Sequence, residues 1–287
     1  MTSLSGGLDP DPGLDPILCA PLIRKVDQRL AELLTSLAPA EWDLPTIVPG
    51  WKVRDVAAHL LDTTLRKLSL ARDRCLVEAV ETASPQELVA LVNRLNREGV
   101  TIYRRLSPAV LVDMMRLACK QSAEFHEALD PFATAAFAVS WAGEETSPNW
   151  FDTARELTER WHHQQQIRLA TGREGIMIRE LYHPVLDCFL RGLPHALGNT
   201  GAAPGAAIEV HISGECGGRW FAVRGHVSWA LVAAAPSEAA ARVTIPQEFA
   251  WRVFAKGIDP DAALEHIVIE GDRSLGEAVL GLTAIVG

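Results

Sequence analysis

The 287-residue sequence contains no clustered run of lysine or arginine and no long apolar segment. Nucleic-acid-binding proteins usually carry a basic patch, so this absence, with a formal charge of −9, argues against a nucleic-acid partner. The same lack of basic clusters argues against binding to an anionic membrane surface. No run reaches the roughly 18 apolar residues that a spanning helix needs, so we expect no membrane protein.

Paired cysteines are also missing. The five cysteines are widely spaced and odd in number, and no C-x-x-C occurs. This pattern excludes a disulfide framework and a cysteine-type zinc site. The first residues lack the basic and apolar regions of a signal peptide. We therefore expect a cytoplasmic protein with reduced thiols.

The common catalytic signatures are absent as well. The sequence contains no G-x-S-x-G, G-x-x-x-x-G-K-[ST], G-x-G-x-x-G or H-E-x-x-H. These absences exclude the usual hydrolase, nucleotide-binding and metalloprotease motifs, so any site must be sought in less familiar patterns.

The first two thirds of the chain have helical periodicity. Residues 1–13 are rich in Gly, Pro and Asp and predict a flexible tail. Asp15 and Pro16 fit the N-cap and first position of a helix, and Ser84, Pro85 and Glu87 fit a capping box. Apolar spacing predicts helices over about residues 17–37, 53–74, from 85 onward, 108–129, 150–171 and 180–197.

The last third changes from a period of 3.6 to a period of 2. Strands are expected at IEVHIS, RWFAV, WALVAA, ARVTIP and HIVIEG, with helices at PQEFAWRVFAKG and SLGEAVLGLTAIV. The Gly- and Pro-rich stretch LGNTGAAPGAA is typical of a linker, with the boundary near residues 199–206. The predicted fold class is α + β, with a helical domain over 14–198 and a small α+β domain over 207–287.

One helix carries a candidate ligand pair in the segment RELTERWHHQQQIRLATGR. Glu159 and His163 are four residues apart and share a face, so one metal ion can contact both. The alternative interpretation is a polar face turned to water. That face comprises Asp152, Glu156, Glu159, His163, Gln166 and Ala170.

His59 is the complementary candidate, in the segment WKVRDVAAHLLDTTL. It lies at the edge of an apolar helix face and is expected to point inward, where a hydrogen-bonded core histidine is the alternative. Two imidazoles and one carboxylate are common donors for Zn²⁺ or a similar divalent ion with open positions. We therefore predict a metal site of His59, Glu159 and His163; these donors suit several divalent ions, zinc and nickel among them, and do not identify the metal.

Several neighbours leave alternatives open. His162 offers a rival register, paired with Thr158 or Gln166, and Asp62 could reach an ion beside His59 or orient a ligand. Three arginines near the motifs could bind carboxylates but are interpreted as surface charges: Arg54, Arg66 and Arg160. The remaining histidines show no ligand spacing and are interpreted as structural: His126, His183, His195, His211, His226 and His266.

The two motifs together resemble a known family. PGWKVRDVAAHLLD, with Trp51 leading into His59, and TERWHHQQQIR are similar to the ligand helices of the mycothiol-dependent maleylpyruvate isomerase N-terminal family, a DinB-like bundle. The resemblance implies a divalent metal, usually zinc, bound by His59, Glu159 and His163. The C-terminal part resembles a sterol-carrier-like domain. One position departs from the family, because Gln166 stands where an Asp often follows the ligand histidine.

The resemblance implies a metal-dependent enzyme that uses a low-molecular-weight thiol such as mycothiol. A thiol at an open metal position loses its proton and becomes a nucleophile. Addition to an activated double bond and re-elimination would isomerise a small-molecule substrate, whereas displacement would transfer the sulfur. The alternatives are a non-catalytic metal or small-ligand sensor or carrier, and a degenerate member without metal. The sequence predicts neither the substrate nor the oligomeric state.

Overall fold

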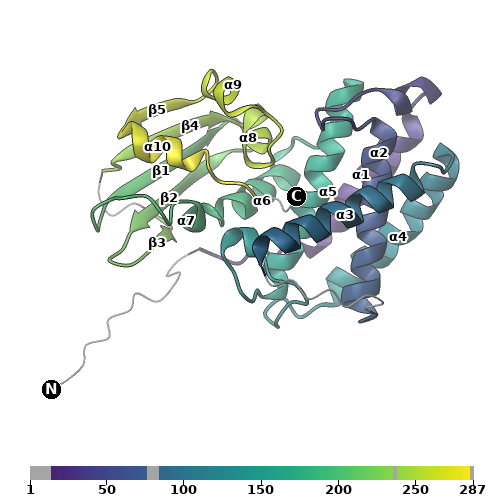
Figure 1. Ribbon diagram of the computed structural model, residues 1–287, viewed down its shortest axis with the longest axis horizontal. Coiled ribbons are helices and arrows are strands. Elements are labelled where there is room, and N and C mark those ends of the chain that lie inside the picture. The colour runs from purple at the N-terminus through teal and green to yellow at the C-terminus, as the bar shows by residue number, and fades with distance from the viewer. Residues whose placement is uncertain (1–13, 76–83, 235–237, 285–287) are drawn as a thin grey trace. The chain divides into compact units, whose positions relative to one another are not determined.

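The computed structural model describes residues 14–75, 84–234 and 238–284. The tail predicted for residues 1–13 therefore lies outside the described part. The described chain forms two compact units, which are coloured from purple to yellow along the sequence in Figure 1. The first is helical and comprises residues 17–140 and 144–188. The second contains the sheet and comprises residues 14–16, Trp141–Gly143 and Phe189–Ala284.

The helical unit confirms the predicted order of helices. Its α-helices are α1 (Ala20–Ser36), α2 (Val53–Lys67), α3 (Pro85–Tyr103), α4 (Pro108–Ala128), α5 (Asn149–Thr171) and α6 (Arg179–Leu190). The Ser84 hydroxyl accepts a hydrogen bond from the Glu87 amide, which confirms the Ser84 half of the predicted capping box of α3. Gly172 ends α5 with a φ of 65°, a left-handed conformation that glycine adopts without strain.

Two helix boundaries differ from the prediction. Helix α1 begins at Ala20, because Cys19 occupies the N-cap and Pro21 lies in the first turn, so Asp15 and Pro16 do not start it. The predicted helix to residue 197 is interrupted after Leu190, and a short α7 (Leu193–Ala196) follows. The end of α2 continues as one π-helical turn over Leu68–Arg72. Short 3-10 turns also occur at Pro39–Asp43 and Ser140–Ala142.

The core of the helical unit lies between α1, α2, α4 and α5. Leu30 and Leu34 from α1 pack with Leu61 from α2 and Met115 from α4 in one buried cluster, which Ile167 of α5 joins. Helix α5 is buried on nearly every side, including positions with polar side chains. A largely buried central helix can place polar groups inside the unit only if partners satisfy them.

The second unit is built on a five-stranded mixed sheet. Its strands are β1 (Ala207–Ser213), β2 (Gly218–Arg224), β3 (Trp229–Val232), β4 (Ala241–Pro246) and β5 (Val268–Gly271). Their order is β3-β2-β1-β4-β5, and only the β1–β4 pair is parallel. The helices that follow in the chain are α8 (Gln247–Phe254), α9 (Pro260–Leu264) and α10 (Arg273–Val279). All five predicted strands are confirmed, whereas α9 was not predicted.

Alternation along β1 separates a core face from a charged face. Ile208, Val210 and Ile212 are fully or almost fully buried, as period-2 patterning requires. Between them, Glu209 faces the other way and is covered by ion pairs of 2.9 Å to Arg219 and Arg242. The helical unit followed by this sheet confirms the predicted α + β class. The boundary near residues 199–206 and the sterol-carrier-like assignment stay predictions.

No helix in the described ranges is long and apolar enough to cross a membrane.

Candidate metal centre

His59 lies on α2, which positions its ring inside the helical unit. The Lys52 amide donates a hydrogen bond of 3.0 Å to Asp55 Oδ2, which fixes the first turn of α2. Two turns later His59 is only 4% exposed, and its ring centroid lies 5.2 Å from that of Trp51. The inward orientation expected for His59 is therefore confirmed.

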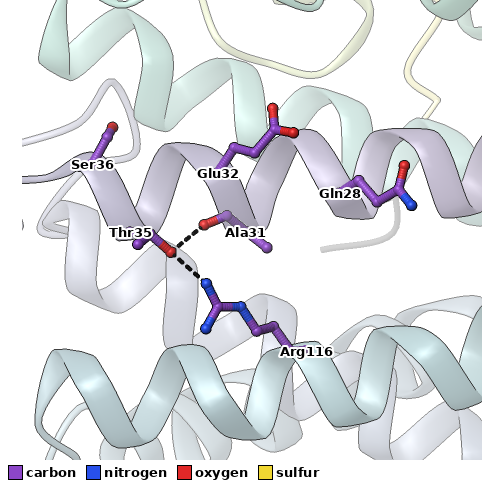
Figure 2. Close-up of a pocket in the computed structure, with 6 residues that line it drawn as sticks. All are labelled: Gln28, Ala31, Glu32, Thr35, Ser36 and Arg116. Atoms are coloured by element: carbon purple, nitrogen blue, oxygen red, sulfur yellow. Dashed lines mark hydrogen bonds between the residues drawn. The ribbon is translucent and has the colours of Figure 1, made fainter.

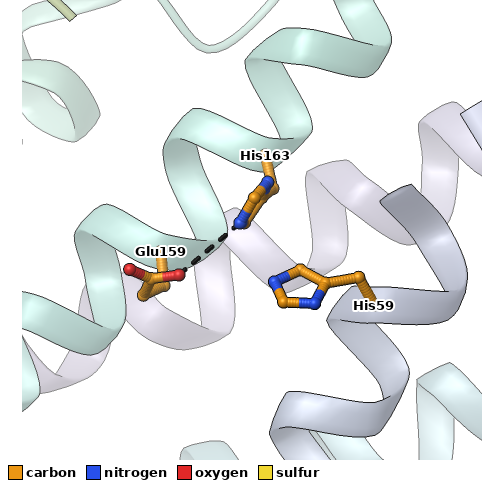
Figure 3. Close-up of side chains that lie close together, drawn as sticks. All are labelled: His59, Glu159 and His163. Carbon is orange, nitrogen blue, oxygen red and sulfur yellow. Dashed lines mark ion pairs between the residues drawn. The ribbon is translucent and has the colours of Figure 1, made fainter. Parts of the chain in front are cut away.

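Helix α5 brings Glu159 and His163 to the same place. One potential ligand atom from each of His59, Glu159 and His163 lies within 4.8 Å of the other two. Figure 3 shows the three side chains converging from the two helices. His163 Nε2 is 3.5 Å from Glu159 Oε2, and the rings of His59 and His163 have centroids 4.6 Å apart.

The hydrogen-bonded core histidine considered for His59 does not match the structure. His59 Nδ1 is buried and has no hydrogen-bond partner among the described residues. An ordinary buried histidine satisfies its ring nitrogens, since an unsatisfied buried group costs about 1–3 kcal/mol. Burial, followed by the neighbouring His163, holds the pKa of His59 well below its usual value. The ring is thus neutral at physiological pH and can donate a lone pair.

Glu159 is ionised, in contrast to the neutral His59. Burial raises its pKa, but the contact with His163 and the nearby His162 outweigh that effect and lower the pKa to about 2. The carboxylate is therefore ionised, and its side chain remains 26% exposed. The neutral His59 imidazole and the ionised Glu159 carboxylate are in the donor states that a divalent cation requires. The residues present fit a metal ion.

The polar face of α5 does not point to water. Asp152 and Glu156 are 3% and 6% exposed, and Lys67 of α2 lies 2.6 Å and 3.4 Å from their carboxylate oxygens. Arg155 and Arg160 also pair with Glu156, at 2.7 Å and 2.9 Å. The alternative of a solvated face is therefore wrong, because this polar surface is buried against cations.

The interpretation of Arg160 as a surface charge is wrong. Its guanidinium is buried, lies 3.1 Å from Asp27, and donates a hydrogen bond of 2.7 Å to Ser122. It is not a surface charge, and its donors are already used inside the bundle. Arg54, by contrast, has a side chain that is 33% exposed and forms an ion pair of 3.2 Å with the exposed Asp43.

The two rival ligands have hydrogen-bond partners outside the three-residue group. His162 Nδ1 is 2.8 Å from the Thr158 carbonyl oxygen, so the ring is tied to its own helix. Asp62 accepts a hydrogen bond of 2.8 Å from Arg66 Nε. Neither belongs to the three-residue group. The structure thus favours the register of Glu159 and His163.

Gln166 contacts the site in a way that the sequence did not predict. Its Oε1 lies 2.9 Å from His163 Nδ1, and the residue is 4% exposed. The i+3 spacing within α5 was the available signal, since such residues are neighbours on a helix.

A surface groove between α1 and α4 lies apart from these ligands in the structure. Its lining residues are Gln28, Ala31, Glu32, Thr35, Ser36 and Arg116. Figure 2 shows Arg116 donating to the Thr35 hydroxyl, at 2.9 Å. The groove contains none of the three candidate ligands, and we assign no chemistry to it.

Residues 23–168 match the family described as the mycothiol maleylpyruvate isomerase N-terminal domain, and this range is just over half of the chain. The chain belongs to this family. His59, Glu159 and His163 all fall inside the matched residues. No curated protein matches the sequence.

Two crystal structures are similar in fold to most of this chain. A histidine-to-alanine mutant of mycothiol-dependent maleylpyruvate isomerase is 14% identical with a TM-score of 0.54, covering 89% of this chain and 93% of that one. A second structure of mycothiol-dependent maleylpyruvate isomerase is 13% identical with a TM-score of 0.50, covering 83% and 88%. At identities this low, the structural similarity establishes a shared fold, and the activity has to be tested separately.

Proposed function

We propose that this protein is a metal-dependent enzyme that uses a low-molecular-weight thiol of the mycothiol type. Its reaction would be isomerisation of, or sulfur transfer to, a small electrophilic substrate. The observation that carries the proposal is the convergence of His59, Glu159 and His163 within 4.8 Å, in a chain of this isomerase family.

Under this proposal the three side chains hold one divalent ion, with zinc preferred and nickel as the alternative. When bound with an open coordination position, such an ion supplies a site where a thiol becomes a thiolate. His59 is neutral because it is buried, and Glu159 supplies the single negative charge of the ligand set.

The three candidate ligands differ in exposure. His59 is nearly inaccessible at 4%, whereas the side chains of His163 and Glu159 are 12% and 26% exposed. Under this proposal, a small molecule would approach the ligand set from the side of Glu159. The buried ion pairs of Lys67 with Asp152 and Glu156 join α2 to α5.

The first experiment measures metal content by elemental analysis on protein purified without an affinity tag. Wild type is compared with His59→Ala and His163→Ala, and His211→Ala in the sheet unit serves as the matched control. We expect about one equivalent of zinc or nickel in wild type and in the control, and loss of the metal in both ligand variants.

A screen of thiols against small electrophiles then tests catalysis. The proposal predicts thiol-dependent turnover that disappears in Glu159→Ala and His163→Ala. Metal without turnover would instead support a sensor or carrier. Little metal in wild type would overturn the enzymatic proposal as framed.

A further inference from the structure

Gln166 is a buried amide that contacts one of the candidate ligands, His163. Its Oε1 is 2.9 Å from His163 Nδ1, and both residues belong to α5. An amide oxygen accepts hydrogen bonds and cannot donate them, so His163 Nδ1 must carry the proton. In the neutral ring, the lone pair is then on Nε2.

That lone pair faces a second acceptor. His163 Nε2 lies 3.5 Å from Glu159 Oε2, and Figure 3 shows the two groups directed toward one another. With one proton on Nδ1, the space between Nε2 and Glu159 Oε2 can hold a second proton or a metal ion. A cation bound by both atoms would satisfy this arrangement.

Gln166 is the last of three consecutive glutamines, residues 164–166, whose surroundings differ. Gln164 is fully buried, donates to the Val26 carbonyl at 2.9 Å and accepts from Arg168, so it ties α5 to α1. Gln165 is half-buried. Gln166 contacts the candidate ligand His163.

We propose that Gln166 is a positioning residue that fixes the tautomer and ring orientation of His163, so that Nε2 is presented to the ion. The inference rests on the proposed function. Because the Gln166 amide is uncharged, it makes His163 a weaker donor than a carboxylate partner would.

The chain offers a matched set of variants. Gln166→Met preserves length and removes the acceptor, Gln166→Glu preserves shape and adds a charge, and Gln165→Met is the control. The first readout is the ¹⁵N shift of the His163 ring in metal-free protein near about pH 8, where ordinary imidazoles are neutral. The second is zinc affinity, measured by competition with a chromophoric chelator.

We expect the Nδ1–H tautomer in wild type, Gln165→Met and Gln166→Glu, and a mixture of tautomers in Gln166→Met. Zinc affinity should fall by roughly 10–100-fold in Gln166→Met and rise above wild type in Gln166→Glu. A merely structural role would lower stability without changing the tautomer.

Opposite results separate the two proposals. An Nε2–H tautomer in metal-free wild type, or equal zinc affinity in wild type and Gln166→Met, would overturn the role of Gln166. If Gln166→Met does not fold, weaker zinc binding by Gln166→Glu than by wild type overturns it instead. Failure of wild type to bind either zinc or nickel would overturn the proposed function, while the tautomer of His163 in metal-free protein would still test the contact with Gln166.

Discussion

The rings of His59 and His163 meet edge to face, with centroids 4.6 Å apart and planes at 73°, although they belong to α2 and α5. Two imidazoles at this distance cannot both be protonated without strong repulsion, and His163 is the second cause, after burial, of the low pKa of His59. The pair therefore offers lone pairs to an ion when Glu159 completes the group.

Glu159→Gln should nearly abolish metal binding while leaving the helix intact. The amide has the same shape but removes the only negative charge among the three ligands. We expect zinc affinity to fall by more than the roughly 10–100-fold that is typical when a residue that hydrogen-bonds to a metal ligand is mutated. Isothermal calorimetry would measure the loss, and Glu124→Gln on the exposed face of α4 is the control. Unchanged affinity in Glu159→Gln would exclude the carboxylate as a ligand.

Zinc should stabilise wild type against heat. An ion that binds only the native state at about 100 times its Kd adds about 2.7 kcal/mol, which corresponds to a Tm increase of roughly 5–10 °C. Differential scanning fluorimetry with and without zinc would detect it. The same addition should leave the Tm of His59→Ala unchanged, and an equal increase in that variant would place the zinc elsewhere.

Lys67→Met should destabilise the helical unit strongly. The ammonium is 6% exposed and pairs with Asp152 and Glu156, so its removal leaves buried carboxylates short of a cation. Breaking a buried pair from one side costs about 3–5 kcal/mol, measured by urea unfolding.

Lys120→Met is the control for that measurement. Lys120 is exposed, 4.0 Å from Glu124, and such surface pairs contribute about 0–1 kcal/mol. Equal losses in the two variants would show that the buried pairs contribute nothing beyond a surface contact.

His126 should make the protein less stable as the pH falls from about 6.5 to about 4. Burial is the main reason that its folded-state pKa is lowered from 6.5 to about 4. Between these pH values the histidine binds a proton in the unfolded chain but not in the folded chain. The free energy of unfolding therefore decreases as the pH falls, by up to about 3 kcal/mol.

His126→Gln removes this titration and retains a group that can bond to Thr153, whose hydroxyl is 3.2 Å from His126 Nδ1. Urea unfolding across the pH range should show a shallower decline than in wild type. His59 and His162 have lowered pKa values and titrate in the same direction, so a residual slope is expected. An identical slope in the variant would contradict the prediction.

Periodicity and capping were sufficient to predict much of the fold. Helix α5 was predicted over 150–171 with Gly172 as its end, and the structure has Asn149–Thr171 followed by a left-handed Gly172. These features depend on residues close in sequence, which is why they can be predicted. The start of α1 was misplaced because Asp15 and Pro16 fit a local cap that the chain does not use.

The site was predicted in part. The ligand residues could be proposed because Glu159 and His163 share a helix face and His59 lies at an apolar edge. The burial of the polar face of α5 could not be predicted, because it depends on Lys67, Asp27 and other partners that are far away in the sequence. A polar stripe has the same periodicity whether water or a buried cation faces it.

His59 and Glu159 are one hundred positions apart in the sequence, and this separation has a kinetic consequence. During synthesis α2 leaves the ribosome well before α5, and a contact of such long range forms late because a large loop must close first. The ligand set is therefore incomplete throughout translation of the first helices. An ion could bind to all three side chains only after α5 had been made and had packed against α2.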